Sequence, residues 1–338
     1  MRTAAERLPV LDGLRAISIL LVLACHMLPL GPKSFQLNET AGAMGMSLFF
    51  ALSGFLITSG LRRNLSIYEF MLRRLSKIIP LAYGYTVLVF IFMTFDPLSL
   101  FWTDVFVANY VHAYLNSYNS HFWSLCVEVQ FYFAIATAVV LTGRKGLMLV
   151  WPVCIAITAI RISQHSYINI ETHLRADEIL AGACLATIFH VSWIGRMRFA
   201  AVLFCGAAAL WFLSASPFTG WLQYTRPYAT AFLLAAALCL PNTRPSQVLS
   251  SGPLRYIATI SYALYVVHPL TIHGWWNDGG PLVRYLLKRP ISFAMTFATA
   301  HFATFYWEQT WIRAARQMIQ KRRDMLLGRG TRPTPLPI

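Results

Sequence analysis

Residues 11–26 read LDGLRAISILLVLACH, an apolar run that carries two titratable side chains, Arg15 and His26. A helix needs roughly 20 mostly apolar residues to cross a bilayer, and this block has the composition of such a span. Arg15 and His26 are eleven residues apart, which is nearly three helical turns, so they share one helix face and lie about 16 Å apart along its axis. Charged groups inside a bilayer are costly and are therefore candidates for function. We expect a buried pair, with Arg15 near one membrane surface and His26 past the midplane.

The whole chain has the composition of a membrane protein. Hydrophobic residues make up 57% of the 338 residues and charged residues 12%, whereas a soluble domain carries about 25% charged residues. The sequence predicts an all-α, polytopic helix bundle in residues 1–312 and a basic tail, partly disordered, in residues 313–338. The expected bundle has about ten transmembrane helices, at 15–31, 43–61, 78–95, 123–142, 147–162, 176–193, 199–214, 227–241, 257–275 and 290–308.

The net charge of +15 is explained by the loops between these spans. Most Lys and Arg residues fall in alternate loops, which by the positive-inside rule predicts that both termini, with Arg2 and Arg7, are cytoplasmic. This pattern argues against nucleic-acid binding. The loops on the opposite side, 96–122, 161–175 and 276–289, are expected to form either a lid or substrate-binding surface, or re-entrant or interfacial helices. The six cysteines lie in apolar blocks without metal-ligand spacing, so we interpret them as small buried hydrophobic residues and expect no metal.

Polar side chains gather at three further places. Arg73 and Lys77 share a helix face beside Arg74, which suits polyphosphate or anionic headgroups, although simple anchoring to the cytoplasmic surface explains them too. Ser47, Ala51, Ser53 and Gly54 are small, as close packing between helices requires. In the fourth span, Ser124, Glu128 and Tyr132 form one stripe that follows Trp123. A buried Glu128 needs a partner, and we expect an imidazole at similar depth.

Two later segments also place polar groups in apolar surroundings. The sixth span opens with Arg175, Asp177 and Glu178, and the ninth contains Tyr265 and a second deep histidine, His268. We predict that the substrate-binding residues include Trp123, Ser124, Tyr132, Arg175, Asp177, Tyr265 and His268.

Five segments in this order resemble the acyltransferase-3 family of integral membrane O-acyltransferases. The arginine, ten residues and histidine of 15–26 match the family's opening motif, and residues 45–55 and 73–80 resemble the next two, with Lys77 in place of an arginine. Residues 123–132 match its Trp-Ser-Leu-x-Val-Glu-x-Gln-Phe-Tyr motif, with Cys126 and Val129 in place of the commoner serine and glutamate at the two variable positions. Residues 261–268 match its Ser-Tyr-x-Leu-Tyr-x-x-His motif. The resemblance covers residues 11–308.

The resemblance implies that an acyl group, usually acetyl, moves from cytoplasmic acyl-CoA to a hydroxyl of an extracytoplasmic glycan or lipid-linked saccharide, such as an exopolysaccharide. It also implies a location in the bacterial inner membrane, among membrane lipids, with His26 as the catalytic residue and Arg73, Arg74 and Lys77 as the donor-binding site. Our hypothesis is that His26 is the general base, Glu128 orients it, and Arg15 holds the donor or stabilises negative charge. An acyl-histidine intermediate, a transporter or flippase for a glycan or lipid, and a scaffold subunit are the alternatives.

Overall fold

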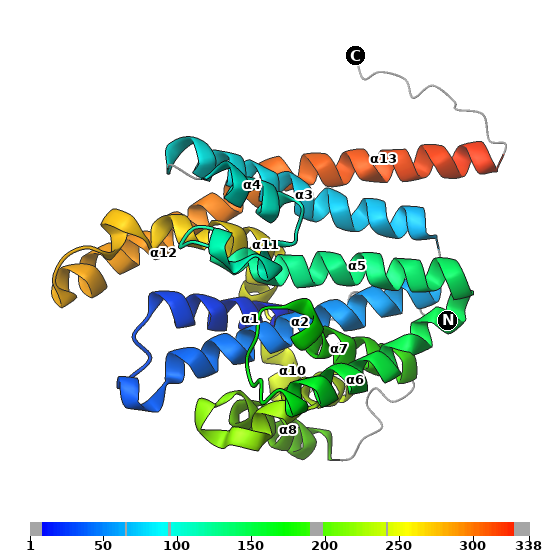
Figure 1. The fold of residues 1–338 in the computed structure, drawn as a ribbon, viewed down its shortest axis with the longest axis horizontal. Coiled ribbons are helices and arrows are strands. Elements are labelled where there is room, and N and C mark those ends of the chain that lie inside the picture. The colour runs from blue at the N-terminus through cyan, green and yellow to red at the C-terminus, as the bar shows by residue number, and fades with distance from the viewer. Residues whose placement is uncertain (1–8, 65, 94–95, 190–198, 241–242, 328–338) are drawn as a thin grey trace.

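The computed structural model describes residues 9–64, 66–93, 96–189, 199–240 and 243–327. All regular secondary structure in these ranges is helical (Figure 1), which confirms the all-α class. The predictions for Arg2, for Arg7 and for the last eleven residues of the basic tail, 328–338, lie outside the described residues.

Each of the ten apolar blocks expected from the sequence contains a helix. The described helices are α1 (Pro9–Met27), α2 (Leu37–Arg63), α3 (Ile67–Phe92), α4 (Pro97–Asp104), α5 (Trp123–Thr142), α6 (Val150–Ser163), α7 (Asp177–Ile188), α8 (Ala200–Ala215), α9 (Arg226–Cys239), α10 (Arg244–Leu249), α11 (Gly252–Val267), α12 (Arg289–Phe302) and α13 (Gln309–Leu326). Short 3-10 segments join several of them. A π-helical segment, Ala303–Glu308, makes α12 and α13 one continuous helix.

Four described helical stretches are long and apolar enough to cross a membrane. They are α1, α2, α3 and the stretch Ser120–Ser163, which contains α5 and α6, while α8 is apolar but shorter. Large apolar side chains on these helices face outward: Ile91 is 64% exposed, Leu141 76% and Val202 69%. Side chains of this kind suit contact with lipid. The number of spans and the side on which the termini lie stay predictions.

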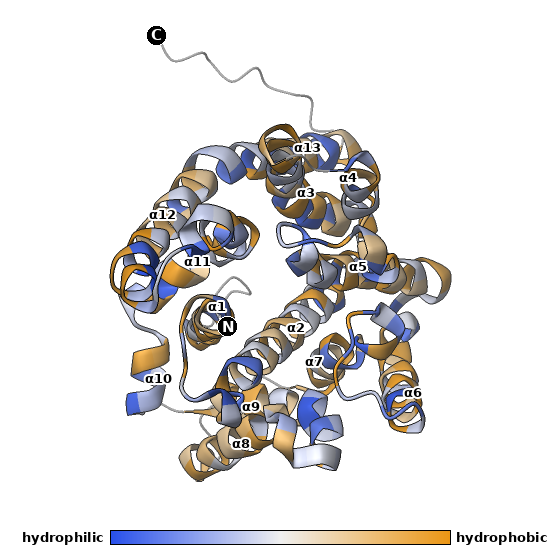
Figure 2. Cartoon of the chain, turned by 60° about the vertical axis from the view of Figure 1, so that its left-hand side comes forward, coloured by the Kyte–Doolittle hydropathy of each residue, from blue (hydrophilic) through white to orange (hydrophobic). Residues whose placement is uncertain are grey.

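Helix α2 runs through the middle of the bundle, with α1 on one side and α7 on another (Figure 2). Small residues permit this crossing, as the sequence predicts. A methyl group added to Gly54 would lie 1.8 Å from the carbonyl oxygen of Ile179, and one added to Gly182 would lie 2.0 Å from that of Ala51. The backbones of α2 and α7 are therefore in direct contact, and neither glycine can be replaced without moving the two helices apart.

The long helix formed by α12 and α13 carries the chain past the expected domain division at residue 312. Residues 313–326 are helical, and Arg323 on α13 binds Glu69 on α3 through two hydrogen bonds of 2.6 and 2.5 Å. Arg322 lies over the ring of Tyr68, 4.0 Å from its centroid. The first half of the basic tail is thus an ordered part of the bundle.

The burial of three polar side chains corrects one expectation and agrees with another. Helix α1 ends at Met27, so His26 lies in its last turn and is exposed, while Arg15 is half-buried. The expected buried pair is therefore wrong, because both side chains face cavities. Helix α11 ends at Val267, and His268 begins a 3-10 turn, although it is fully buried. Among the cysteines, Cys205 on α8 is exposed, contrary to expectation, because its helix face is turned outward.

Candidate active site

Three cavities follow one another along α1. The first, the arginine cavity, has a volume of about 300 Å³, the central cavity about 60 Å³, and the third, the histidine cavity, about 400 Å³. Arg15 and Lys77 line both of the first two, and Val22, Met46 and Tyr265 line both of the last two. The three cavities therefore form a series of neighbours, and the central one has the smallest volume.

The arginine cavity is rich in cations. Arg15 of α1, Arg73 and Lys77 of α3 and Arg316 of α13 line it, against the two carboxylates of Asp12 and Glu308. Arg73 also forms an ion pair with Glu69 at 3.3 Å. The predicted position of Arg73 and Lys77 on one face is confirmed. An excess of positive charge at a mouth of this size suits an anionic ligand such as a polyphosphate.

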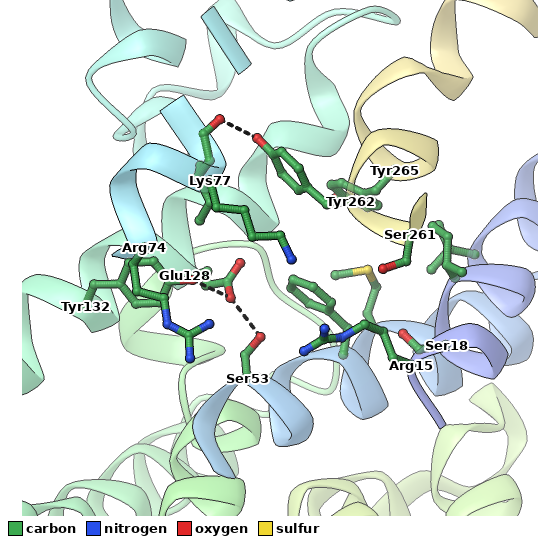
Figure 3. Close-up of a pocket in the computed structure, with 15 residues that line it drawn as sticks. Arg15, Ser18, Ser53, Arg74, Lys77, Glu128, Tyr132, Ser261, Tyr262 and Tyr265 are labelled. Atoms are coloured by element: carbon green, nitrogen blue, oxygen red, sulfur yellow. Dashed lines mark hydrogen bonds between the residues drawn. The ribbon is translucent and has the colours of Figure 1, made fainter. Parts of the chain in front are cut away.

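The central cavity brings Arg15, Arg74 and Lys77 around the carboxylate of Glu128 (Figure 3). Oε1 of Glu128 accepts a hydrogen bond of 2.7 Å from Ser53 and another of 2.7 Å from Tyr132. The stripe predicted for Glu128 and Tyr132 is confirmed, since the two side chains are bonded on one face of α5. Three cations around one carboxylate leave this narrow passage positively charged.

These contacts correct the expected role of Glu128. The sequence predicts an imidazole as its partner, but its partners are Ser53 and Tyr132, and no hydrogen bond joins it to His26 within the described ranges. The physical reason is axial position: Glu128 lies more than a turn inside α5, beside the middle of α1, whereas His26 lies in the last turn of α1. Ser53, which the sequence indicates only as a small packing residue, completes the carboxylate's surroundings.

The histidine cavity contains three of the seven residues predicted to bind substrate. His26, Trp123, Arg175 and Tyr265 line it, together with Glu39, which the sequence does not single out. The exposed imidazole of His26 thus meets a cavity lined by an indole, a carboxylate and a guanidinium. Indole rings stack on the apolar faces of sugars, and charged groups bind their hydroxyls. The cavity can hold a saccharide-sized ligand against His26.

Two more histidines lie beside His26. The ring centroids of His26 and His268 are 5.3 Å apart, and those of His268 and His121 are also 5.3 Å apart. Sequence reasoning missed His121, although it stands two residues before Trp123 in the motif. His273 follows in the loop after His268, between Thr271 and Gly274.

Tyr265 and Ser124 hold the start of α5 against α11. The Tyr265 hydroxyl donates to the carbonyl oxygen of His121, and Ser124 Oγ lies 2.5 Å from the same hydroxyl. Because the carbonyl only accepts, Ser124 is the donor in the second bond. Ser124 therefore acts on the cavity through Tyr265, and it is not among the residues that line the three cavities.

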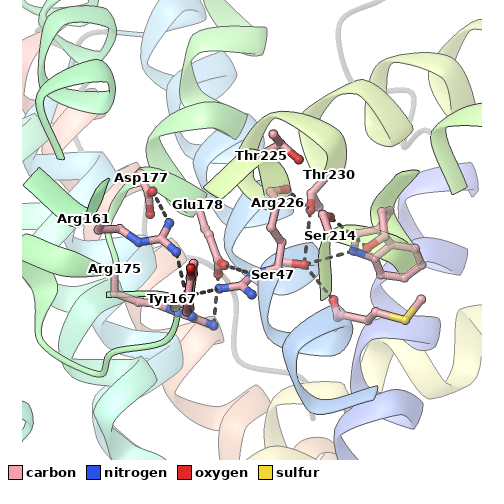
Figure 4. Close-up of polar contacts among 12 residues, drawn as sticks. Ser47, Arg161, Tyr167, Arg175, Asp177, Glu178, Ser214, Thr225, Arg226 and Thr230 are labelled. Atoms are coloured by element: carbon pink, nitrogen blue, oxygen red, sulfur yellow. Dashed lines mark hydrogen bonds and ion pairs between the residues drawn. The ribbon is translucent and has the colours of Figure 1, made fainter. Parts of the chain in front are cut away.

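Arg175 and Asp177 belong to a buried ionic cluster behind the histidine cavity (Figure 4). Arg161 pairs with Asp177, and Glu178 pairs with Arg226 at 2.7 Å and with Arg175 at 3.3 Å. Arg175 also faces the ring of Trp123 at 5.3 Å and lines the cavity. Asp177 does not line it, so its expected contact with an acceptor lacks support, because its carboxylate is turned toward Arg161 and Thr158.

The apolar helices and the motif residues that line the cavities are those of a membrane acyltransferase. Sequence comparison agrees with this class. The profile of the acyltransferase-3 family, described as an acyltransferase domain, matches residues 8–305. The chain therefore belongs to this family of acyltransferases, and its enzymatic character follows from that membership.

Particular relatives are O-acetyltransferases. The chain is 27% identical over 320 residues to the peptidoglycan O-acetyltransferase OatA of Listeria monocytogenes, covering 79% of this chain and 50% of the relative. It is equally identical, over 320 residues, to the "Putative peptidoglycan O-acetyltransferase YrhL" of Bacillus subtilis, covering 77% and 48%. The chain thus spans about half the length of these curated relatives. No solved structure matches it significantly.

Proposed function

We propose that the protein transfers an acyl group, most simply acetyl, from acyl-CoA bound in the arginine cavity to a hydroxyl of a glycan or glycolipid bound in the histidine cavity. The observation that carries this proposal is the series of three cavities. A cationic cavity and the cavity lined by His26 lie on either side of a smaller central cavity and share lining residues with it. This order suits a donor with a phosphorylated head and a thin thioester arm. The names of the relatives, which include peptidoglycan O-acetyltransferases, support a glycan acceptor.

In this mechanism the phosphates of CoA bind Arg73 and Lys77, and the pantetheine arm extends through the central cavity toward His26. His26 takes the proton of the acceptor hydroxyl as its oxygen attacks the thioester carbonyl. The carbon–sulfur bond then breaks, and the imidazolium returns the proton to the departing thiolate. General-base catalysis of this kind contributes about 10²–10⁴-fold to a rate. Arg15, which lines the arginine and central cavities, holds the donor there, because it lies about 16 Å from His26 along α1 and is too far from the thioester oxygen to balance its charge.

The proposed location is the bacterial inner membrane, with the arginine cavity open to the cytoplasm and the histidine cavity to the outside. Acyl-CoA is a cytoplasmic metabolite, so this orientation places the donor and the acceptor on opposite sides. It agrees with the positive-inside pattern of the loops.

The test is a comparison of wild-type protein with His26→Ala in detergent. Acetyl-CoA is expected to raise the thermal stability of both proteins, and only the wild type is expected to consume it when a saccharide acceptor is present. Mass spectrometry of surface glycans from cells with each version identifies the acceptor. Normal transfer by a folded His26→Ala protein would overturn the role of His26. Absence of any effect of acetyl-CoA on either protein would favour the transporter alternative.

A further inference from the structure

Two buried imidazoles are held in fixed tautomers by the carboxyl end of α11. Nδ1 of His268 lies 2.7 Å from the carbonyl oxygen of Tyr265, and Nε2 of His121 lies 3.1 Å from that of Val266. A carbonyl oxygen can only accept, so each of these nitrogens carries a hydrogen. It follows that, in the neutral rings, Nε2 of His268 and Nδ1 of His121 carry the lone pairs.

The lone pair of His268 lies close to His26, although no hydrogen bond joins the two rings within the described residues. His268 turns its Nδ1 back toward its own helix, which leaves Nε2 on the edge of the ring away from α11. Helix α1, which carries His26, packs against α11. The ring centroids are 5.3 Å apart with a tilt of 33°. Two imidazoles joined in line by an N–H···N bond of about 2.9 Å have centroids roughly 5 Å apart, so the observed separation permits this bond.

The carboxyl end of α11 supplies negative potential beside the two rings. The last carbonyl groups of α11 form the negative end of its dipole, which stabilises a cation near the end of the helix. The other charged or titratable side chains at the cavity are Cys25 from α1, Glu39 from α2, His121 from the turn before α5, Tyr265 from α11, and Arg175, whose charge is partly offset by Glu178 at 3.3 Å. His273 lies in the loop that follows His268.

We infer that His268 is a positioning residue for His26, an inference that rests on the proposed function. Nε2 of His268 accepts a hydrogen bond from one ring nitrogen of His26. This bond turns the other nitrogen of His26, with its lone pair, toward the acceptor hydroxyl and stabilises the imidazolium that forms when the proton is taken. His268 thereby takes the orienting role that the sequence suggests for Glu128, and it does so from within the histidine cluster.

Two substitutions separate this role from a purely structural one. In His268→Asn the amide occupies the place of Nδ1 and keeps the hydrogen bond to the Tyr265 carbonyl, but nothing replaces Nε2. In His268→Gln the amide reaches the place of Nε2 and can accept the bond from His26. We expect kcat of the Asn variant to fall about 10²-fold, with KM for both substrates within a few fold, and the Gln variant to stay within about tenfold of wild type.

The dependence of kcat/KM on pH gives a second test of whether His268 acts through His26. When Nε2 of His268 is lost as a hydrogen-bond acceptor, the imidazolium of His26 is less stable and its pKa falls. The acid limb of the profile should therefore move to lower pH in His268→Asn and stay in place in His268→Gln. Wild-type kcat in the Asn variant would overturn the inference, as would equal losses of kcat in both variants with an unchanged profile. Because the proposed function is judged by His26→Ala, an inactive His26→Ala beside a fully active His268→Asn would reject only the inference drawn here.

Discussion

Ser53 on α2 donates a hydrogen bond of 2.7 Å to Oε1 of Glu128 on α5, directly beside three cationic side chains of the central cavity. Tyr132 donates to the same oxygen. The carboxylate therefore joins two helices and is the counter-charge of the passage between the two larger cavities. The same carboxylate therefore contributes both to the stability of the bundle and to the shape of the central cavity.

Replacement of Glu128 by Ala should therefore destabilise the protein and abolish transfer. The change leaves Ser53 and Tyr132 without their acceptor, and a hydrogen bond to a charged group contributes about 1.5–3 kcal/mol. Thermal unfolding in detergent and an acetyl-CoA consumption assay measure the two effects. The control is Ser53→Ala, which removes one of the two bonds and should lower stability less. A Glu128→Ala protein as stable as wild type would show that the carboxylate has no structural role.

The buried ionic cluster predicts a larger loss of stability. Glu178 is fully buried and is paired with Arg226, which is also fully buried, and with Arg175. Removal of one partner from a buried ion pair typically costs about 3–5 kcal/mol, because the other charge stays buried without compensation. We expect Glu178→Gln to lower the unfolding temperature strongly, whereas Glu171→Gln, at a part-exposed site, should change it little. Similar unfolding temperatures for the two variants would contradict the prediction.

The contact between α2 and α7 predicts a steric effect. Because a methyl group on Gly54 would lie 1.8 Å from the Ile179 carbonyl oxygen, Gly54→Ala must force the helices apart, and overpacking of this kind costs about 1–3 kcal/mol. Gly206 on α8 has no atom within 4 Å of the same position, so Gly206→Ala should be neutral or slightly stabilising. Thermal unfolding of the two variants checks the contrast, which would fail if both behaved alike.

We expect a residue of α13 to contribute to binding of the acyl-CoA donor, although the sequence suggests that this part of the chain is a tail. Arg316 lines the arginine cavity, so Arg316→Ala should raise KM for acyl-CoA about two- to fivefold without changing kcat, the size expected for one partly exposed ionic contact. The effect should shrink at high salt. Arg313, exposed on the same helix, provides the matched control, and equal KM values for Arg313→Ala and Arg316→Ala would exclude a specific role for Arg316.

Much of the fold could be predicted from the sequence because its signals are local. The apolar blocks predict where the helices lie, and the small residues around Gly54 predict a close crossing. The spacing of Arg73 and Lys77 places both at one cavity, and the ordered motifs indicate the acyltransferase-3 family. Each of these features depends on neighbours within a few turns of one helix, where the helical period fixes which residues share a face.

Only the tertiary structure decided which helices meet and at what depth. Helical spacing relates Arg15 to His26, but it does not show that His26 lies in the last turn of α1. It also does not show that Glu128 binds Ser53, or that His268 and His121 lie beside His26. Those contacts join residues up to 242 positions apart, as in the pair His26 and His268, and they depend on the axial register between helices. The axial register between helices is set by the packing of whole helix surfaces, such as the crossing of α2 and α7. The pattern of residues within one helix does not determine it.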